Sequence, residues 1–310
     1  MFWKKILFIF NPVAGMSRIR DSLLDIISIL SSHGYSVECY PTKAPGDARR
    51  IVRECRNEYL YICCAGGDGT LDEVVSGMME NRELPFLPIG YIPSGTTNDF
   101  AGTLGIPSDM KEAAEVIASG KVFNCDIGRF NQEDYFTYVA GFGLFTETSY
   151  DTPQELKNTL GHFAYIIRGA MSLGNIRTYK AIVQAKNINI RDEFAVGLIT
   201  NSKSVGGFAN ITGNNVDLSD GLFEVTLIKM PRNPIEINEI FQALSNNTME
   251  SSLIYHFKTD HLTIMSEDPI SWTRDGEFGG EHNYVELTNI RQKLKIIVPQ
   301  SHLGSLQVVR

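Results

Sequence analysis

One carboxylate, Asp68, stands among three glycines in the stretch GGDGT, residues 66–70, directly after an apolar run. Glycine adopts backbone conformations that other residues avoid, and it lets a ligand approach the chain closely. The start of a helix adds free N–H groups and a partial positive charge, which favour phosphate oxygens. The pattern therefore predicts a phosphate-binding turn, in which the negative charge of Asp68 is the feature that needs a chemical explanation.

The helix after this turn is expected to begin at Thr70, because TLDE at residues 70–73 fits a capping box in which Glu73 reaches back to the N-cap. An apolar stripe follows, made of Leu71, Val74, Val75, Met78 and Met79. A tight glycine turn without a ligand would explain the same residues, since neither a Walker A pattern nor GxGxxG is present.

Two further polar turns follow apolar runs. NPVAG occupies residues 11–15 and IPSGTTNDFA occupies residues 92–101. The carboxyl ends of parallel strands lie along one edge of a sheet, so these turns and GGDGT can converge on a single ligand. Three such turns at one edge favour a binding site over structure alone.

Short apolar runs alternate with helical patterns through about residue 125, as in a parallel sheet covered by helices. Strands are expected near residues 6–10, 35–40, 59–65 and 86–93, and helices near residues 17–34 and 46–57, from residue 71, and near residues 109–120. The fold class is therefore α/β in this part of the chain.

From NCDIGRFN onward most segments have the pattern of strands. They are residues 135–143, 179–186, 194–200, 221–229, 261–266 and 283–288, interrupted by helical patterns at 152–173 and 234–247. We expect a β-rich second domain. The crevice between two such domains is the usual place for a ligand.

Composition excludes several classes of protein. The net charge of −8 over 310 residues argues against a nucleic-acid binder. No run of about 18 apolar residues exists, and the run Ile6–Phe10 is too short for a signal peptide or a membrane span. The five cysteines are odd in number and form no CxxC pair, which indicates reduced thiols in a cytoplasmic protein.

The motifs NPVAG, GGDGTLDEVVSGM, PSGTTNDFA and DGE, the last at residues 275–277, resemble those of the bacterial diacylglycerol kinase-like lipid kinases, which are relatives of sphingosine and ceramide kinases. The resemblance covers nearly the whole chain in the family's order and spacing. GGDG is shared with NAD kinases and 6-phosphofructokinases, whereas GTxNDFA together with DGE narrows the match to lipid kinases.

The resemblance implies an α/β ATP-binding domain of the NAD kinase and diacylglycerol kinase type over residues 1–125. A β-rich sandwich domain for the lipid substrate would follow over residues 126–295, with a tail at 296–310 that packs back on the first domain. It also implies which residues hold ATP: Asn11, Pro12, Gly15, Thr42, Gly66, Gly67, Asp68, Gly69, Thr70, Asp72, Thr96 and Asn98.

Glu277 matches the family's catalytic glutamate, which acts as general base on the lipid hydroxyl. Asp68 and Asp275 are the other predicted catalytic residues, and Asp275 would orient Glu277 or a metal ion. Without the resemblance, TRDGEFGGE would be read as an exposed hairpin turn.

ATP-dependent phosphoryl transfer requires a divalent cation, and the resemblance implies that Asp68, Asp99 and Asp126 hold Mg²⁺ through water or hydrogen bonds. Asp99 would otherwise cap the following segment and Asp126 would begin a strand turn. A second, structural magnesium is implied at Asp217, Asp220 and Leu222, where an Asp-Gly turn before a strand is an equal alternative.

The expected function is therefore an ATP-dependent lipid kinase that converts diacylglycerol to phosphatidic acid. Alternatives are a kinase for a sphingoid base, ceramide, phosphatidylglycerol or NAD, and a nucleotide-responsive regulatory protein without activity. The enzyme would meet its lipid peripherally, and residues 162–180, with Arg168, Arg177 and Lys180, are a candidate contact surface or a core-facing helix. A homodimer is among the assemblies that the sequence allows.

Overall fold

The computed structural model describes residues 4–14, 19–56, 58–81, 83, 87–95, 98–143, 177–205, 208–209, 211–213, 216–246 and 248–306. They form two compact units, Met1–Ile127 with Arg291–Arg310, and Gly128–Ile290. The helix predicted at 152–173 lies outside the described residues.

The first unit is built on a parallel sheet. Its strands are β1 (Lys4–Phe10), β2 (Tyr35–Pro41), β3 (Tyr61–Gly66) and β4 (Ile89–Pro93), in the order β4-β3-β1-β2. The whole of β4 and the last five residues of β1 are buried, as expected for strands covered on both faces. The predicted parallel α/β sheet is confirmed.

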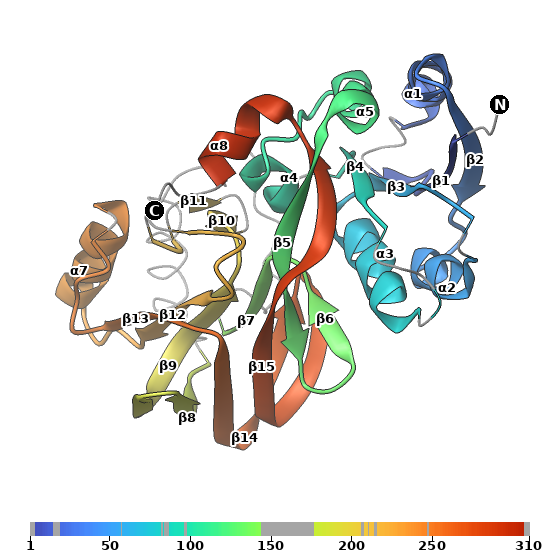
Figure 1. Cartoon of the computed structure of the whole chain (residues 1–310). Coiled ribbons are helices and arrows are strands. Elements are labelled where there is room, and N and C mark those ends of the chain that lie inside the picture. Colours follow the sequence, from blue (N-terminus) through green and yellow to red (C-terminus); the bar gives the residue numbers. More distant parts are fainter. Residues whose placement is uncertain are drawn as a thin grey trace. The chain divides into compact units, whose positions relative to one another are not determined.

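Helices cover both faces of this sheet. α1 (Ile19–Ser32) packs on α5 (Met110–Ser119), and α2 (Asp47–Glu54) packs on α3 (Asp68–Glu80). Figure 1 shows the first pair above the strands and the second pair below them. Asp109 caps α5 by accepting hydrogen bonds from the N–H groups of the second and third helical residues.

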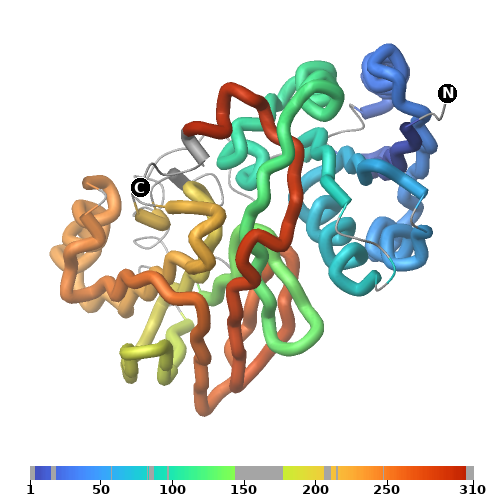
Figure 2. The backbone as a smooth tube through the Cα atoms, in the orientation of Figure 1, coloured from blue at the N-terminus to red at the C-terminus, as the bar shows by residue number. Residues whose placement is uncertain are grey.

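Two long strands, β15 (Glu277–Val298) and β5 (Lys121–Phe130), continue the sheet of the first unit beyond β4. The end of β15 pairs with β4 through Ile296 and Ile89, and β15 also pairs with β5. Their red and green traces run side by side in Figure 2. The chain continues into the short helices η3 (Gln300–His302) and α8 (Leu303–Leu306).

The capping box predicted at Thr70 is wrong. The N-cap of α3 is Gly67, three residues earlier, and no side chain caps this helix. Glu73 instead accepts hydrogen bonds from the N–H groups of Gly46, at 2.7 Å, and Ala48, at 3.1 Å, where α2 begins. Gly46 is the N-cap of α2 and has no side chain, so the neighbouring helix supplies the acceptors that a helix start requires. Within GGDGT, Gly66 therefore ends β3, Gly67 is the N-cap, and the last three residues form the first turn of α3.

The second unit is β-rich, as predicted, and its main sheet is largely antiparallel. The order β13-β12-β9-β7-β14-β15 runs through it, β8 pairs with β9 and β14, and β6 pairs with β5. The elements not yet given are β6 (Asp134–Phe136), β7 (Val139–Gly143), β8 (Tyr179–Ala185), β9 (Ile188–Thr200), β10 (Ser204–Val205), β11 (Phe208–Ala209), β12 (Phe223–Lys229), β13 (Ile254–Thr259), β14 (His261–Arg274) and α7 (Pro234–Ser245).

The core of the second unit is aromatic. Trp272 of β14 is fully buried, and its ring meets those of Phe130 and Phe142 edge to face at 5.4 and 5.0 Å. Such edge-to-face contacts add to the stabilisation that burial already gives. They fix the end of β14 and thus the hairpin that connects it to β15.

Candidate active site

The turns after four parallel strands line up at one edge of the first unit's sheet. The N–H of Asn11 donates to a carbonyl near the end of β3 at 3.0 Å, and that of Thr42 donates to the last carbonyl of β1 at 2.9 Å. The N–H of Ser94 donates to the carbonyl of Gly66 at 2.8 Å. The turns therefore lie along one edge as predicted, and their binding of a single ligand stays a prediction. Pro12 lies in the first of them, whereas Gly15 and Thr96 lie outside the described residues.

The glycines of the GGDGT and PSGTT turns allow two backbones to touch. A Cβ on Gly66 would lie 2.3 Å from Thr70 Oγ1, and a Cβ on Gly95 would lie 2.6 Å from the Cα of Gly67. Both distances are too short for real contacts, so these positions require glycine for packing alone. Gly95 thus brings the turn after β4 against Gly67 in the turn after β3, whereas Gly66 makes room for the side chain of Thr70 in its own turn.

Asp68 and Asp72 lie one helical turn apart at the start of α3, and both are half-buried. Gly69 and Thr70 belong to the same first turn, and the N–H of Thr70 donates to the carbonyl of Gly67 at 3.0 Å. The positive end of the helix dipole partly offsets the charge of Asp68. The helix start thus combines a partial positive charge, which suits phosphate, with two carboxylates, which suit a cation.

Asn98 shapes the turn after β4. It has a left-handed backbone, with φ 50°, and it is the N-cap residue of α4 (Asp99–Thr103). Its Oδ1 accepts a hydrogen bond from the N–H of Gly95 at 3.0 Å, and its Nδ2 donates to the carbonyl of the same residue at 2.9 Å. The predicted ATP contact at Asn98 therefore belongs to a residue that also holds the turn in shape.

Two residues at this edge were missed in the sequence. The Tyr91 hydroxyl lies 3.2 Å from the carbonyl oxygen of Gly66 and 3.4 Å from Asn98 Oδ1. The buried Ser94 hydroxyl has no hydrogen-bond partner within the residues that the structure describes. Neither residue stands out in the sequence, because Tyr91 reads as one more apolar residue of a strand and Ser94 as one more small residue of a turn.

The predicted magnesium ligands Asp99 and Asp126 are buried. Asp126 Oδ1 accepts a hydrogen bond from the N–H of Gln292 at 2.7 Å, which fastens β5 to β15. Asp99 is the first residue of α4. Across the described ranges, no three His, Cys, Asp or Glu side chains are grouped to hold a metal ion. Magnesium needs only one or two carboxylates when phosphate oxygens and water complete its shell, so the lack of such a group does not contradict a magnesium ion here, and the roles of Asp99 and Asp126 stay predictions.

In the second unit, Asp275 and Gly276 form the tight turn between β14 and β15. Both have positive φ, 48° and 87°, as a two-residue hairpin of this type requires. The buried Asp275 carboxylate accepts hydrogen bonds from Thr137 N and Oγ1 at 2.5 and 2.7 Å, and from the N–H groups of Tyr138 and Val139 at 3.0 Å each. Burial raises the pKa of the Asp275 carboxyl, and the four donors oppose that rise. Asp275 therefore anchors the hairpin to the chain before β7.

Glu277 is the first residue of β15 and its side chain is exposed. It pairs in register with Arg274, the last residue of β14, whose guanidinium binds Asp134 at 2.9 Å. The predicted base therefore projects from a fixed turn. The Asp-Gly hairpin that the sequence offered as an alternative is present, and it carries Glu277.

The predicted second magnesium site lies before β12. Asp217 Oδ1 accepts hydrogen bonds from the N–H and hydroxyl of Ser219, both at 2.9 Å, and Asp220 Oδ1 accepts one from the N–H of Leu222 at 2.9 Å. The other oxygen of Asp220 lies 3.2 Å from Lys258 Nζ. Carboxylate oxygens suited to magnesium are present, but an ion at Asp220 would compete with this ammonium. The second metal site stays a prediction.

Lys258 also contacts Glu224, a buried carboxylate that sequence reasoning missed, at 2.8 Å. Burial raises the pKa of Glu224 to about 7, although Lys258 opposes that shift. The two residues face each other across β12 and β13. The ammonium is thus shared by two acidic side chains of the second unit.

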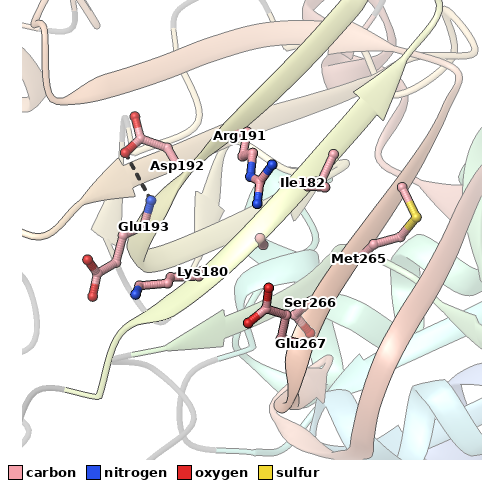
Figure 3. Close-up of a pocket in the computed structure, with 9 residues that line it drawn as sticks. Lys180, Ile182, Arg191, Asp192, Glu193, Met265, Ser266 and Glu267 are labelled. Atoms are coloured by element: carbon pink, nitrogen blue, oxygen red, sulfur yellow. Dashed lines mark hydrogen bonds between the residues drawn. The ribbon is translucent and has the colours of Figure 1, made fainter.

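A cavity of about 420 Å³ lies on the strands β8, β9 and β14 of the second unit. Figure 3 shows Ile182 of β8 between Arg191 of β9 and Met265 of β14, with Lys180 of β8 beside Glu193, and Glu267 beside Ser266. Lys180 belongs to the predicted lipid-contact surface, and Arg177 lines an adjoining hollow, whereas Arg168 lies outside the described residues. Of the described helices, none is long and apolar enough to span a membrane.

Comparison with known proteins gives consistent results. Residues 5–130 match the family model of the diacylglycerol kinase catalytic domain. A diacylglycerol kinase of Bacillus subtilis (strain 168) is 31% identical over 305 residues, which cover 98% of this chain and 99% of that protein. One from Staphylococcus epidermidis is 33% identical over 300 residues, which cover 96% of this chain and 93% of that protein. The crystal structure of a diacylglycerol kinase from Bacillus anthracis str. Sterne superposes with a TM-score of 0.80 at 25% identity, covering 98% of this chain and 99% of that one.

Proposed function

Because the chain belongs to the diacylglycerol kinase family, we propose that it transfers the γ-phosphoryl group of ATP to the free hydroxyl of diacylglycerol and releases phosphatidic acid and ADP. The observation that carries this proposal is the full-length match to diacylglycerol kinases, combined with three polar turns that meet at one sheet edge. A regulatory protein without activity is disfavoured because Asp68, Asp99 and Glu277 are all retained.

ATP is proposed to bind at the turns of the first unit. Its phosphates and ribose would contact three places: the turn after β1 with Asn11, the loop after β2 with Thr42, and the helix start at Gly67–Asp72. The N–H groups at the start of α3 suit phosphate oxygens. Magnesium, when bound with ATP, offsets the charge of the phosphates during transfer. Asp68 would face that ion or its water ligands.

Glu277 is proposed as the general base. Its carboxylate accepts the proton of the lipid hydroxyl while the hydroxyl oxygen forms a bond to the γ-phosphorus, and the bond from that phosphorus to the bridging oxygen of ADP breaks. Asp275, buried and bonded four times to the chain before β7, would act only by holding the hairpin that presents Glu277.

The choice of acceptor is tested with a panel of lipids. Mixed micelles would contain diacylglycerol, a sphingoid base, ceramide or phosphatidylglycerol at equal surface concentration, with γ-labelled ATP and magnesium, and NAD would be tried in solution. We expect label in phosphatidic acid at a rate at least about tenfold above any other product, since buried polar groups of a matched site discriminate at least this strongly. A higher rate with another acceptor would mean that this acceptor, and not diacylglycerol, is the substrate. No transfer to any acceptor would favour a regulatory protein.

We also propose that the protein is cytoplasmic and meets the membrane through the cavity on β8, β9 and β14. Lys180 and Arg191 lie there beside Ile182 and Met265, and neither cation forms an ion pair in the part of the chain that the structure describes. Cations that accompany apolar side chains suit an anionic lipid surface. Asp192, Glu193 and Glu267 also line this cavity, so the proposed contact depends on these two cations and the apolar side chains and not on a net positive charge of the lining.

Reversing both charges, Lys180→Glu with Arg191→Glu, is expected to lower binding to vesicles with 30% phosphatidylglycerol by at least about tenfold, because each cation near such a surface contributes about 1 kcal/mol. Sedimentation with vesicles measures this. The matched control reverses two exposed cations of the first unit, Lys121 and Arg56, and keeps the same net charge change. Equal losses in both variants would mean that overall charge, rather than this patch, governs binding.

A further inference from the structure

Tyr91 lies in the middle of β4 with its side chain almost fully buried, 1% exposed. In the parallel register it is paired with Cys64 of β3, two residues before the end of that strand. A buried tyrosine in a central strand usually needs a partner for its hydroxyl. Here the hydroxyl reaches past the strand to the sheet edge where the turns meet.

The hydroxyl of Tyr91 lies between two turns, and its single hydrogen is shared between one acceptor of each turn. It lies 3.2 Å from the carbonyl oxygen of Gly66, which begins the turn after β3, and 3.4 Å from Oδ1 of Asn98, which belongs to the turn after β4. Both acceptors already have a shorter bond, from the N–H of Ser94 at 2.8 Å and from that of Gly95 at 3.0 Å. Neither acceptor would be left without a partner if the hydroxyl were removed. The hydroxyl therefore contributes more to the position of the two turns than to the stability of the fold.

The hydroxyl remains protonated. Burial is the main reason that the pKa of Tyr91 is raised well above its usual value, and the negative charge of Asp68 adds to the rise. The phenol is therefore a permanent donor beside Asp68, at the helix start proposed to receive phosphate. The group is too deep in the strand to contact a lipid.

We propose that Tyr91 is a positioning residue of the nucleotide site, whose hydroxyl fixes the turn after β3 relative to the turn after β4. Asn98 transmits the effect, because its Oδ1 binds both the Tyr91 hydroxyl and the Gly95 N–H. The two turns also touch at Gly67 and Gly95, so a small shift in one moves the other. This inference rests on the proposed binding of ATP at these turns.

The test is Tyr91→Phe, which keeps the ring and removes only the hydroxyl. The Michaelis constant for MgATP is expected to rise by about 3- to 10-fold, the equivalent of one ordinary hydrogen bond. The turnover number should change by less than about twofold, and the melting temperature should stay within about 4 °C, since both acceptors keep a shorter hydrogen bond from a backbone N–H. If Tyr91 only stabilised the fold, the melting temperature would fall, and the Michaelis constant would not rise while the turnover number stayed unchanged.

Tyr59→Phe is the matched control. Its hydroxyl also makes one hydrogen bond, to Glu38 at 3.0 Å, but it lies before the amino end of β3, away from the turns. The Michaelis constant of this variant should equal that of the wild type. An unchanged value in Tyr91→Phe as well, with wild-type protein that binds MgATP normally in calorimetry, would overturn the role of Tyr91 alone. Wild-type protein that binds no MgATP would overturn the proposed nucleotide site itself.

A double-mutant cycle tests the route through Asn98. Asn98→Gly removes the side chain and tolerates the left-handed backbone at this position. If Tyr91 acts through Asn98, adding Tyr91→Phe to Asn98→Gly should raise the Michaelis constant for MgATP by less than about twofold more. If the Michaelis constant of the double variant rose by the product of the two single-variant increases, Tyr91 would not act through Asn98.

Discussion

Replacing Glu277 by glutamine is expected to lower the turnover number by about 10²- to 10⁴-fold, the usual contribution of a general base. Glutamine has the shape of glutamate but cannot accept the proton of the lipid hydroxyl. Glu277 is exposed at the start of β15, so its replacement should leave the fold intact. The affinity for MgATP, measured by calorimetry, should change by less than twofold, because the proposed nucleotide contacts all lie in the first unit.

Glu281→Gln provides the control for this prediction. Glu281 is an exposed carboxylate on the same strand, four residues later, and it carries the same charge. Its replacement should leave turnover unchanged. Wild-type turnover in Glu277→Gln would remove the assignment of the base, and an equal loss in both variants would point to a general effect of charge on that strand.

Replacing Asp275 by alanine is expected to lower the free energy of unfolding by about 3–5 kcal/mol. The change removes the acceptor of four hydrogen bonds and leaves the N–H groups of Thr137, Tyr138 and Val139 to find other partners. Alanine is also strained at the φ of 48° found here. Denaturation by urea measures the loss, and turnover should fall as well, because the hairpin that carries Glu277 loses its anchor.

Asp275→Asn separates this anchoring role from direct catalysis. Asparagine tolerates the left-handed backbone and keeps one acceptor oxygen. Its NH₂ group is itself a donor, however, and cannot accept hydrogen bonds from the N–H groups that the second carboxylate oxygen bound. We expect an intermediate loss of stability accompanied by a partial loss of turnover. Wild-type stability combined with abolished turnover would mean that Asp275 acts on the reacting groups or on a metal ion, and not only by holding the hairpin.

The alternation of strands and helices in the first unit was predictable, because buried parallel strands are short apolar runs and each helix carries an apolar stripe. The meeting of the turns followed from the same reasoning, since parallel strands place their carboxyl ends at one edge. The strand β13 was missed. Its residues IYHFKT mix polar and aromatic side chains, and only its pairing with β12 makes it a strand.

Contacts between distant residues could not be predicted. TLDE satisfies the local pattern of a capping box, yet Glu73 serves α2, because Gly46 there has no side chain to offer. Asp275 binds Thr137, which is 138 positions away in the chain. The Asp-Gly sequence indicated the hairpin correctly, since both residues accept positive φ, but not the bonds that bury the carboxylate. Local patterns predict elements, whereas partners depend on the completed fold.

Phosphoryl transfer from ATP to a lipid hydroxyl is tested most directly by comparing two labels. Wild-type protein would be incubated with magnesium, diacylglycerol in mixed micelles, and ATP labelled either at the γ- or at the α-phosphorus, and the lipid would then be extracted. We expect label in phosphatidic acid from γ-labelled ATP only, and at least about 10²-fold slower labelling when Glu277→Gln replaces the wild type. An absence of lipid-bound label from γ-labelled ATP, with protein that is folded and binds MgATP, would contradict the proposed kinase activity.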